Sequence, residues 1–130
     1  MTPSDCPFCN LPPERIRLRA GAGYAVPDRY PLGKGHTLVI PRRHVASIYD
    51  LPDEEIAALW RLAGEVRSML EGEHAPDGFN IGLNDGAAAG QTIGHAHIHV
   101  VPRFAGDVAD PRGGIRWVIP ERAPYWNPET

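Results

Sequence analysis

The segment His95-Ala96-His97-Ile98-His99 places a histidine at every second position. Side chains along a β-strand alternate between its two faces, so a strand here carries all three imidazoles on one face and Ala96 and Ile98 on the other. Packing alone explains this pattern poorly, because imidazoles are costly to bury without partners and repel one another when protonated. The segment therefore predicts a strand over residues 94–102, with an apolar face toward the core and a histidine face used for chemistry.

A second group of potential ligands lies near the N-terminus, in Cys6-Pro7-Phe8-Cys9. A stable disulfide is not expected in a reducing compartment, so the pair is either a redox dithiol or half of a metal site. A redox pair usually begins a helix, whereas prolines surround this one and no helical pattern follows. Metal is therefore favoured, and two further nitrogen ligands would complete a tetrahedral zinc site.

The histidine face has two interpretations. All three imidazoles bind one catalytic metal that keeps an open position for water, or they divide the work between one nucleophile and neighbours that position it or bind metal. If the cysteines recruit His95 and one further histidine, the three-histidine site is lost. His97 then remains free to act as a nucleophile.

The other predicted elements are short and are separated by many of the fourteen prolines and fourteen glycines. Strands that follow one another through short turns, with one main helix inserted, favour an antiparallel sheet with a helix on one face, which is an α+β fold. Besides the histidine strand, strands are predicted at residues 16–20, 24–26, 36–40 and 79–83. A short helical turn is expected at residues 47–51.

The longest predicted element is a helix that begins at Pro52 and ends at Gly72. Proline is tolerated in the first turn of a helix, where the following acidic residues also favour the positive end of the dipole. Apolar residues recur at spacings of three and four and form one stripe that should pack on the sheet. The stripe consists of Ile56, Leu59, Trp60, Ala63, Val66, Met69 and Leu70.

Length and composition indicate one domain over residues 1–130, in which residues 1–13 form a knuckle and residues 107–130 an extended, irregular tail. The formal net charge of −3 offers no basic surface for extended nucleic acid. No stretch approaches the ~20 apolar residues of a membrane span, and the N-terminus lacks a cationic, apolar signal segment. A cytoplasmic protein with no nucleic-acid or membrane partner is expected.

Four segments together resemble the histidine triad (HIT) family. His95-Ala96-His97-Ile98-His99-Val100-Val101 is similar to the family's His-φ-His-φ-His-φ-φ motif, in which φ is apolar. Gly90-Gln91-Thr92, Asn84-Asp85-Gly86 and Gly35-His36-Thr37-Leu38-Val39-Ile40-Pro41 resemble the segments that accompany it, in the same order. The resemblance covers residues 6 to about 104. It implies an α+β HIT-like fold with a roughly five-stranded antiparallel sheet, one main helix and one short helix, and it implies a homodimer.

The same resemblance implies an enzyme that acts at the α-phosphate of a nucleotide, as a nucleotidyl hydrolase or transferase. The middle histidine, His97, would attack phosphorus and form a covalent nucleotidyl-histidine, with His99 and His36 as polar or proton-handling groups. Asp28 stands where the family places an Asp or Asn that binds the ribose hydroxyls. The phosphate would be bound by the small-residue loop and its amides, through Asn84, Gly90, Gln91 and Thr92.

A zinc-binding subset of the family pairs a CxxC motif with the first triad histidine and with a histidine that follows the Val-x-Pro strand. The ligands that this implies are Cys6, Cys9, His44 and His95. A Cys2His2 site without an open position is structural, so zinc is expected to stabilise the fold. His74, beside glutamates near the end of the predicted helix, is expected to be a solvated surface residue.

The substrate is less tightly determined. A dinucleoside polyphosphate such as diadenosine tetraphosphate and a nucleoside phosphoramidate both suit hydrolysis at the α-phosphate, and residues 100–104 are more similar to the dinucleoside polyphosphate hydrolases. Nucleotidyl transfer or phosphorolysis is one alternative. A non-catalytic nucleotide-binding module is another, although such a module has no need of a nucleophile. The tail residues Arg112, Arg116 and Trp117 either reach a polyphosphate or base, or form a subunit interface.

Overall fold

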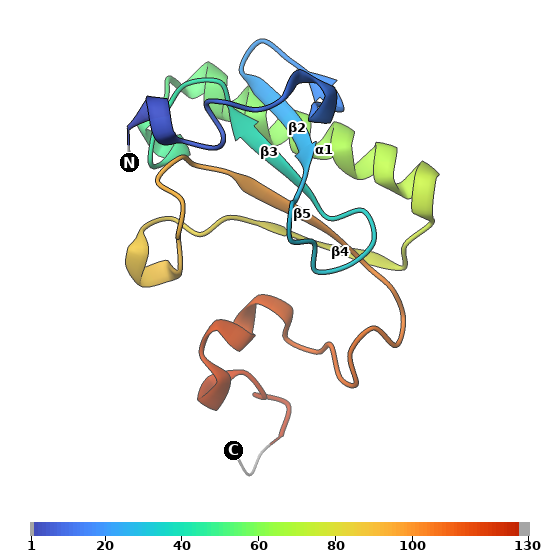
Figure 1. The fold of residues 1–130 in the computed structure, drawn as a ribbon. Coiled ribbons are helices and arrows are strands. Elements are labelled where there is room, and N and C mark those ends of the chain that lie inside the picture. The colour runs from blue at the N-terminus through green and yellow to red at the C-terminus, as the bar shows by residue number, and fades with distance from the viewer. Residues whose placement is uncertain (1, 128–130) are drawn as a thin grey trace.

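The computed structural model describes residues 2–127, which form a five-stranded antiparallel sheet with one long helix on one face (Figure 1). In chain order the strands are β1 (Leu18–Arg19), β2 (Gly23–Pro27), β3 (Thr37–Pro41), β4 (Gly78–Gly82) and β5 (Ile98–Arg103), and helix α1 spans Asp53–His74. The 3₁₀ helices are η1 (Pro3–Asp5), η2 (Pro13–Arg15), η3 (Ile48–Asp50), η4 (Ala87–Ala89), η5 (Gly114–Val118) and η6 (Pro120–Arg122). The predicted α+β architecture, the main helix and the short helical turn are confirmed.

Strand β5 lies inside the sheet, whose order is β1-β2-β3-β5-β4. His99 is opposite Leu38 of β3 on one side and Gly82 of β4 on the other. Ladders on both sides therefore fix the position of His99, and they bring the residue just before β3, His36, beside it. An interior strand holds its side chains more precisely than an exposed loop does.

The face of β5 that packs on α1 is apolar, as the alternation predicts. Ala96, Ile98 and Val100 are at most 5% exposed and belong to one buried cluster with the inner stripe of α1. That stripe consists of Leu59, Leu62, Ala63, Val66 and Leu70. Burial of these side chains, each a large aliphatic group or an alanine, is the main source of stability for this layer.

The prediction that Trp60 belongs to the stripe is wrong, since its side chain is 37% exposed. Successive residues of a helix are rotated by about 100° around its axis, so the residue after the buried Leu59 lies well off the buried face. Leu62, at a spacing of three from Leu59, occupies the stripe instead.

The helix also ends later than Gly72. It continues to His74, and Ala75 follows with φ of 49° in the left-handed conformation while its amide donates to the carbonyl of Glu71. A glycine costs a helix about 1 kcal/mol and does not by itself terminate it. His74 is half-buried rather than fully solvated. Its ring packs closely on Gly35, where an added Cβ would lie only 2.8 Å from it.

The histidine strand begins later than predicted, at Ile98 instead of Gly94. Its pairing with β3 ends at Val39 opposite Ile98, and the amide of Ala96 donates instead to the carbonyl of Val45, at 2.7 Å. Pro41 at the end of β3 has no N–H with which to continue the ladder. His95 and His97 therefore lie in the segment that leads into β5.

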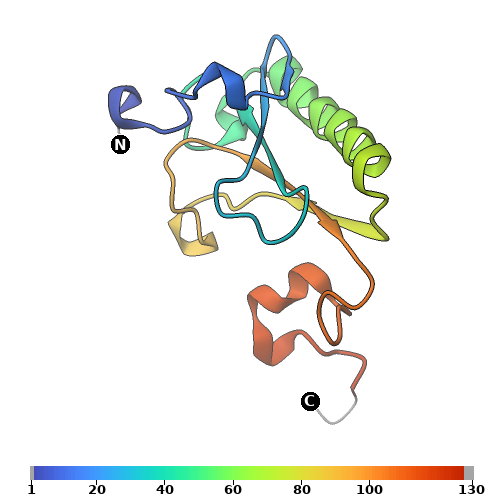
Figure 2. The same ribbon diagram turned by 45° about the vertical axis from the view of Figure 1, so that its right-hand side comes forward.

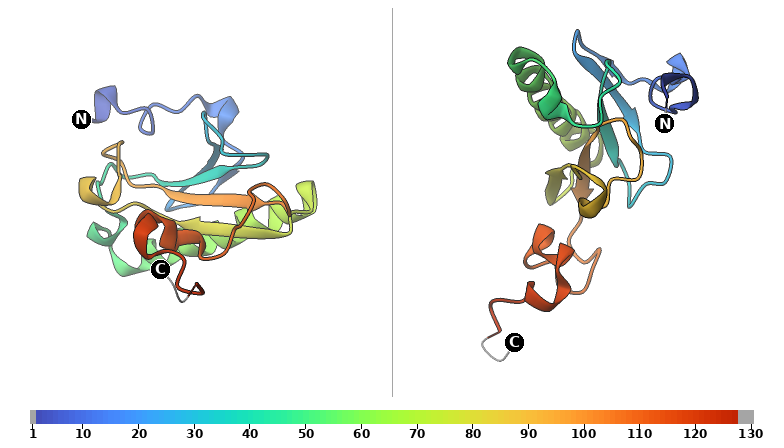
Figure 3. Two further views of the ribbon diagram at one scale, coloured as in Figure 1. Left: turned by 90° about the horizontal axis from the view of Figure 1, so that it is seen from below. Right: turned by 90° about the vertical axis from the view of Figure 1, so that its left-hand side faces the viewer.

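The N-terminal segment lies across the face of the sheet opposite α1, as Figure 2 and the left panel of Figure 3 show. Phe8, Leu11 and Ile16 pack there on a second buried cluster made of Val26, Leu38 and Ile40. The helix thus covers one face of the sheet, and the N-terminal segment covers β2 and β3 on the other.

The segment after β5 projects beyond the edge of the sheet (Figure 3, right panel). Its described part, residues 107–127, is not extended as expected but folds back through η5 and η6. Gly113 and Gly114 have φ of 91° and 45°, which other residues rarely adopt, and Arg112 and Arg116 lie over the rings of Trp126 and Tyr125. No helix in residues 2–127 is long and apolar enough to cross a membrane.

Candidate functional site

His97 lies at the centre of the histidine face, with one ring nitrogen already engaged. Its Nδ1 is 3.0 Å from the carbonyl oxygen of His95. A carbonyl only accepts hydrogen bonds, so Nδ1 carries the proton and Nε2 keeps an unshared electron pair in the neutral ring. The backbone thus sets the tautomer that a nitrogen nucleophile requires.

His36 and His99 form a hydrogen-bonded pair on one side of His97. The amide of Leu32 donates to Nδ1 of His36, at 3.0 Å. The proton of neutral His36 is therefore on Nε2, which lies 2.9 Å from Nδ1 of His99. His99 in turn carries its proton on Nε2, and its ring lies 5.0 Å from that of His97. A chain of donors runs from the Leu32 backbone through two imidazoles toward the nucleophile.

Asp28 lies at the outer end of this pair. One carboxylate oxygen accepts from the amide of Tyr30 at 2.9 Å, and the other is 3.4 Å from Nε2 of His36. The side chain is only 17% exposed. The structure therefore brings Asp28 to the histidines, as predicted for a residue of the same site.

Burial determines the charge state of the pair. Burial, and after it the neighbouring His97 and His36, lower the pKa of His99 to about 4, while Asp28 opposes them. Burial also lowers the pKa of His36, again against the opposing charge of Asp28. Both rings are therefore neutral at pH 7, so His99 offers a hydrogen-bond donor and not a positive charge.

The four predicted metal ligands converge on the other side of His97. Cys6, Cys9, His44 and His95 offer Sγ and Nδ1 atoms that all lie within 4.8 Å of one another. Cys6 and His95 are fully buried, whereas Cys9 is exposed at the rim. Nε2 of His95 lies 2.8 Å from the carbonyl oxygen of Pro41, an arrangement that orients the ring and directs Nδ1 at the cysteines.

The spacing of these donors fits a tetrahedral zinc ion. Zinc–sulfur and zinc–nitrogen bonds of about 2.3 and 2.0–2.1 Å imply sulfur–nitrogen and nitrogen–nitrogen separations of roughly 3.5 and 3.3 Å. Nδ1 of His95 is 3.4 and 3.5 Å from the two sulfurs and 3.2 Å from Nδ1 of His44. Sγ of Cys9 is 3.2 Å from Nδ1 of His44. The donor set and its separations both suit zinc.

Phe8 connects the metal-ligand cluster to His97, a contact that the sequence did not predict. Its ring makes edge contacts with His95 at 5.8 Å and with His97 at 5.1 Å between centroids. Because Phe8 stands between Cys6 and Cys9, its place on His97 depends on how the knuckle is held. The Cys-Pro-Phe-Cys spacing was the available signal, but nothing in the sequence indicated which ring the phenylalanine contacts.

The small-residue loop before the triad differs from the prediction at Gln91. Both donors of its amide are directed inward, to the carbonyls of Ala46 at 2.8 Å and Ile93 at 3.0 Å, and its oxygen accepts from the amide of Gly86. Gln91 therefore organises the loop and has no hydrogen left for a phosphate oxygen.

Two side chains at this loop keep their donors free, whereas its backbone amides at Gly90 and Gln91 are engaged. Gly86 and Gly90 have φ of 95° and 97°, so only glycine is unstrained there. The amides of Gly90 and Gln91 donate within the loop, to Ala87 and Gly86. Within residues 2–127, the exposed side chains of Asn84 and Thr92 donate to no other group.

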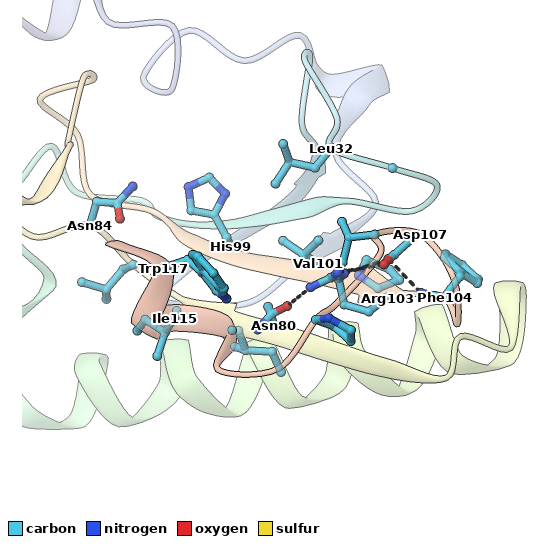
Figure 4. Close-up of a pocket in the computed structure, with 18 of the residues that line it drawn as sticks. Leu32, Asn80, Asn84, His99, Val101, Arg103, Phe104, Asp107, Ile115 and Trp117 are labelled. Atoms are coloured by element: carbon cyan, nitrogen blue, oxygen red, sulfur yellow. Dashed lines mark hydrogen bonds and ion pairs between the residues drawn. The ribbon is translucent and has the colours of Figure 1, made fainter. Parts of the chain in front are cut away.

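A cavity of about 670 Å³ lies between the sheet edge and the tail. At one end of it His99 and Asn84 face Ile115 and Trp117 of η5, and Arg103 and Phe104 lie at the other end (Figure 4). A second cavity of about 300 Å³ adjoins Asp28 and His36.

Known proteins are similar to this chain in sequence and fold. Residues 13–106 match the model of the HIT domain. The chain is 42% identical over 85 residues to an AP-4-A phosphorylase of Mycobacterium tuberculosis, covering 65% of this chain and 44% of that protein. It is 38% identical over 97 residues to the bifunctional bis(5'-adenosyl)-triphosphatase/adenylylsulfatase FHIT of Arabidopsis thaliana, covering 75% and 54%. The chain thus spans about half the length of these curated relatives.

A solved structure has a similar fold over most of its length. The zinc-bound histidine triad family protein of Mycobacterium smegmatis is 36% identical, with a TM-score of 0.73, and the match covers 84% of this chain and 82% of that one. The similarity extends over most of both chains.

Proposed function

The chain belongs to the histidine triad (HIT) family, and from this premise we propose that it is a nucleotidyl hydrolase that cleaves at the α-phosphate of a nucleoside phosphate derivative. The observation that carries the proposal is the hydrogen bond between Nδ1 of His97 and the carbonyl of His95, which leaves Nε2 unprotonated. An imidazole is a good nucleophile only in that state.

The reaction has two steps in this proposal. Nε2 of His97 donates its electron pair to the α-phosphorus, a nitrogen–phosphorus bond forms, and the bond from phosphorus to the leaving group breaks. The leaving group departs with the bonding pair. Water then attacks phosphorus and loses a proton to solvent, the nitrogen–phosphorus bond breaks with its pair returning to Nε2, and a nucleoside monophosphate is released while His97 returns to its neutral form.

Neighbouring residues supply donors for the charge that develops on the phosphate. The ring of His99, whose proton is on Nε2, lies next to that of His97, and the free side chains of Asn84 and Thr92 stand at the loop before the triad. Such preorganised donors stabilise developing negative charge without reorganisation. In this proposal Asp28 binds the ribose hydroxyls through the carboxylate edge that faces the smaller cavity, and Gly90 permits the close approach of the loop.

Zinc bound by Cys6, Cys9, His44 and His95 is proposed as a structural ion. It would tie the knuckle to the sheet and hold the segment that carries His97. All four ligands come from the protein, so no position is left for water or substrate.

The acceptor in the second step distinguishes two enzymes. With diadenosine tetraphosphate, hydrolysis yields AMP and ATP, whereas phosphorolysis yields ADP and ATP because phosphate replaces water. The relatives include a protein named as a phosphorylase and one named as a triphosphatase. We propose water as the acceptor, and phosphorolysis is the second candidate.

Wild type and His97→Ala, incubated with diadenosine tetraphosphate, adenosine phosphoramidate and adenosine phosphosulfate, test the function. We expect the wild type to release AMP and the variant to release none, while His74→Ala, a histidine outside the site, stays within a few-fold of wild type. Equal turnover by His97→Ala would contradict the role of the nucleophile. Absence of turnover by the wild type would instead favour a nucleotide-binding module, and ADP formed only with added phosphate would favour the phosphorylase.

We also propose that the protein is a homodimer. Strand β4 stands at the edge of the sheet, and Ile81 on it is 40% exposed. An unpaired edge with an apolar side chain is a template for pairing with a second copy. Light scattering coupled to size-exclusion chromatography checks the mass, and a monomer at micromolar concentration would contradict the proposal.

A further inference from the structure

Asp28, His36 and His99 form a second group of side chains with the spacing of metal ligands. Their ligand atoms all lie within 4.8 Å of one another. Nε2 of His36 is 3.4 Å from a carboxylate oxygen of Asp28 and 2.9 Å from Nδ1 of His99. Two imidazoles and a carboxylate are a common ligand set of catalytic zinc sites, in which the nitrogens lie roughly 3.3 Å apart. Residue types and spacing alone therefore allow a zinc ion beside the nucleophile.

Burial does not keep an ion away from this group. Asp28 and His36 line the cavity of about 300 Å³. His99 lines the cavity of about 670 Å³, and Figure 4 shows its ring projecting from the strand among the other lining residues. An ion can approach from either side, so the chemistry of the ligands must determine whether it binds.

The proton of His36 is on the wrong nitrogen for a metal. The carboxylate of Asp28 only accepts, and Nδ1 of His99 has an unshared pair, so both are ready to bind. The amide of Leu32 donates to Nδ1 of His36, at 3.0 Å. The proton of the neutral ring is therefore on Nε2, the nitrogen that faces the other two ligands. A protonated nitrogen has no electron pair to give to a metal.

Moving that proton is unfavourable in this position. If Nδ1 of His36 carried it, two N–H groups would face each other across the 3.0 Å that now separates Nδ1 from the Leu32 nitrogen. His36 is only 3% exposed, so solvent offers little replacement for the lost hydrogen bond. His95 has the opposite arrangement, because the carbonyl of Pro41 faces Nε2 and leaves Nδ1 unprotonated for a metal.

We propose that the backbone amide of Leu32 is a positioning group that keeps Asp28, His36 and His99 joined by hydrogen bonds and excludes zinc from them. Zinc is then directed to the Cys2His2 cluster alone. The side chain of Leu32 has no part in this, since it is 80% exposed. This selection depends on metal chemistry only, so it holds whether or not the chain turns over a nucleotide.

Removing the Leu32 N–H tests the proposal. One protein carries Leu32→Pro, and another carries an ester in place of this amide, made by inserting the α-hydroxy acid that corresponds to leucine. Each full-length protein is first loaded with one equivalent of zinc and is then titrated with zinc chloride against a chromophoric chelator. We expect both to bind a second equivalent roughly 10-fold or more tightly than wild type. Leu32→Ala keeps the N–H and should bind it as wild type does.

Two further measurements assign the effect to His36. Adding His36→Ala to the ester protein should abolish the gain in affinity. Nitrogen-15 NMR of histidine-labelled protein reads the tautomer, and we expect Nε2–H on His36 in wild type and in Leu32→Ala.

Three outcomes would overturn the proposal. They are equal affinity of the ester protein and wild type for the second equivalent, a gain that survives His36→Ala, and Nδ1–H on His36 in wild type. Circular dichroism shows whether each protein is folded. If Leu32→Pro does not fold, the ester protein alone decides.

Discussion

Two clusters of ionisable side chains flank His97, and they differ in what they can do for it. On one side Cys6, Cys9, His44 and His95 present four donors to one point, with separations that suit a zinc ion. On the other side Asp28, His36 and His99 also lie within 4.8 Å of one another, but their atoms are joined as donor to acceptor. The first arrangement is a metal clamp, and the second is a hydrogen-bonded series of side chains that sets the tautomers of its histidines.

The difference follows from what each imidazole has as its second partner. Nε2 of His95 lies against a backbone carbonyl, so Nδ1 is an unprotonated donor atom for a metal. Nδ1 of His36 instead accepts from a backbone amide, so Nε2 is protonated and passes a hydrogen bond to His99. His95 and His36 thus acquire different roles from single backbone contacts.

The largest effect is expected at the clamp. Cys6→Ser removes a fully buried ligand, and we expect loss of bound zinc and destabilisation by at least about 3 kcal/mol, a fraction of the ~10–16 kcal/mol that zinc supplies to small zinc-finger peptides. Metal analysis and chemical denaturation measure the two. Cys9→Ser, at the exposed rim, is the matched variant, with a smaller loss of stability. A full equivalent of zinc in Cys6→Ser would show that the cluster is not the metal site.

A loss of catalysis without loss of metal is expected when the hydrogen-bonded residues Asp28, His36 and His99 are changed. His36→Ala removes the donor to His99, and we expect kcat to fall roughly 100-fold while KM changes little and zinc content stays full. His36→Gln can place an amide N–H near the same position and should recover part of kcat. A rise in KM with unchanged kcat would mean that His36 acts in binding and not through His99.

Phe8 allows the coupling between the metal-ligand cluster and His97 to be measured. Phe8→Ala removes the ring that touches both His95 and His97, so we expect kcat to fall roughly 10-fold with zinc retained. Phe8→Leu, which keeps apolar bulk, should have a kcat between those of wild type and Phe8→Ala. Wild type and Phe8→Ala are each measured with and without a zinc chelator, which makes a double cycle. The reactivity of His97 toward diethyl pyrocarbonate gives a readout other than turnover. Strictly additive effects would show that the clamp does not act on His97 through Phe8.

The smallest expected effect is the pH dependence of stability that comes from His99. The pKa of His99 is lowered from 6.5 to about 4 in the folded protein, chiefly by burial, so between these values the unfolded chain binds more protons than the folded one. The free energy of unfolding should therefore decrease as pH falls from about 6.5 toward 4. His99→Asn should reduce this slope. Zinc content is followed at each pH, and an unchanged slope in a zinc-loaded His99→Asn protein would refute the assignment.

The sequence was informative where periodicity and spacing determine position. Alternation in the triad placed Ala96, Ile98 and Val100 toward the helix, and the ligand set Cys6, Cys9, His44 and His95, taken from the family resemblance, converges in space. The sequence was uninformative where a backbone group determines the hydrogen-bond partner of a side chain. Neither the Leu32 amide on His36 nor the carbonyls that occupy Gln91 leave any trace in residue type.

Trp60 and Trp117 show the same limit for side chains. Both are tryptophans with partly exposed rings, 37% and 44%. The helical period was too coarse to exclude Trp60 from the core, because one residue's rotation separates it from Leu59. Nothing in the pattern of the tail indicated that Trp117 lines the cavity while Arg112 and Arg116 turn to partners within the tail.

The central claim is that His97, set apart from its neighbours by these two clusters, forms the covalent bond to phosphorus. Rapid acid-free quenching of wild type during turnover of diadenosine tetraphosphate, followed by peptide mass spectrometry, tests it directly. We predict an adenylyl group on His97, carried in larger amounts when the second step is slowed. An adenylyl group on His95, His99 or another residue, or turnover with no covalent adduct at any time, would contradict the account.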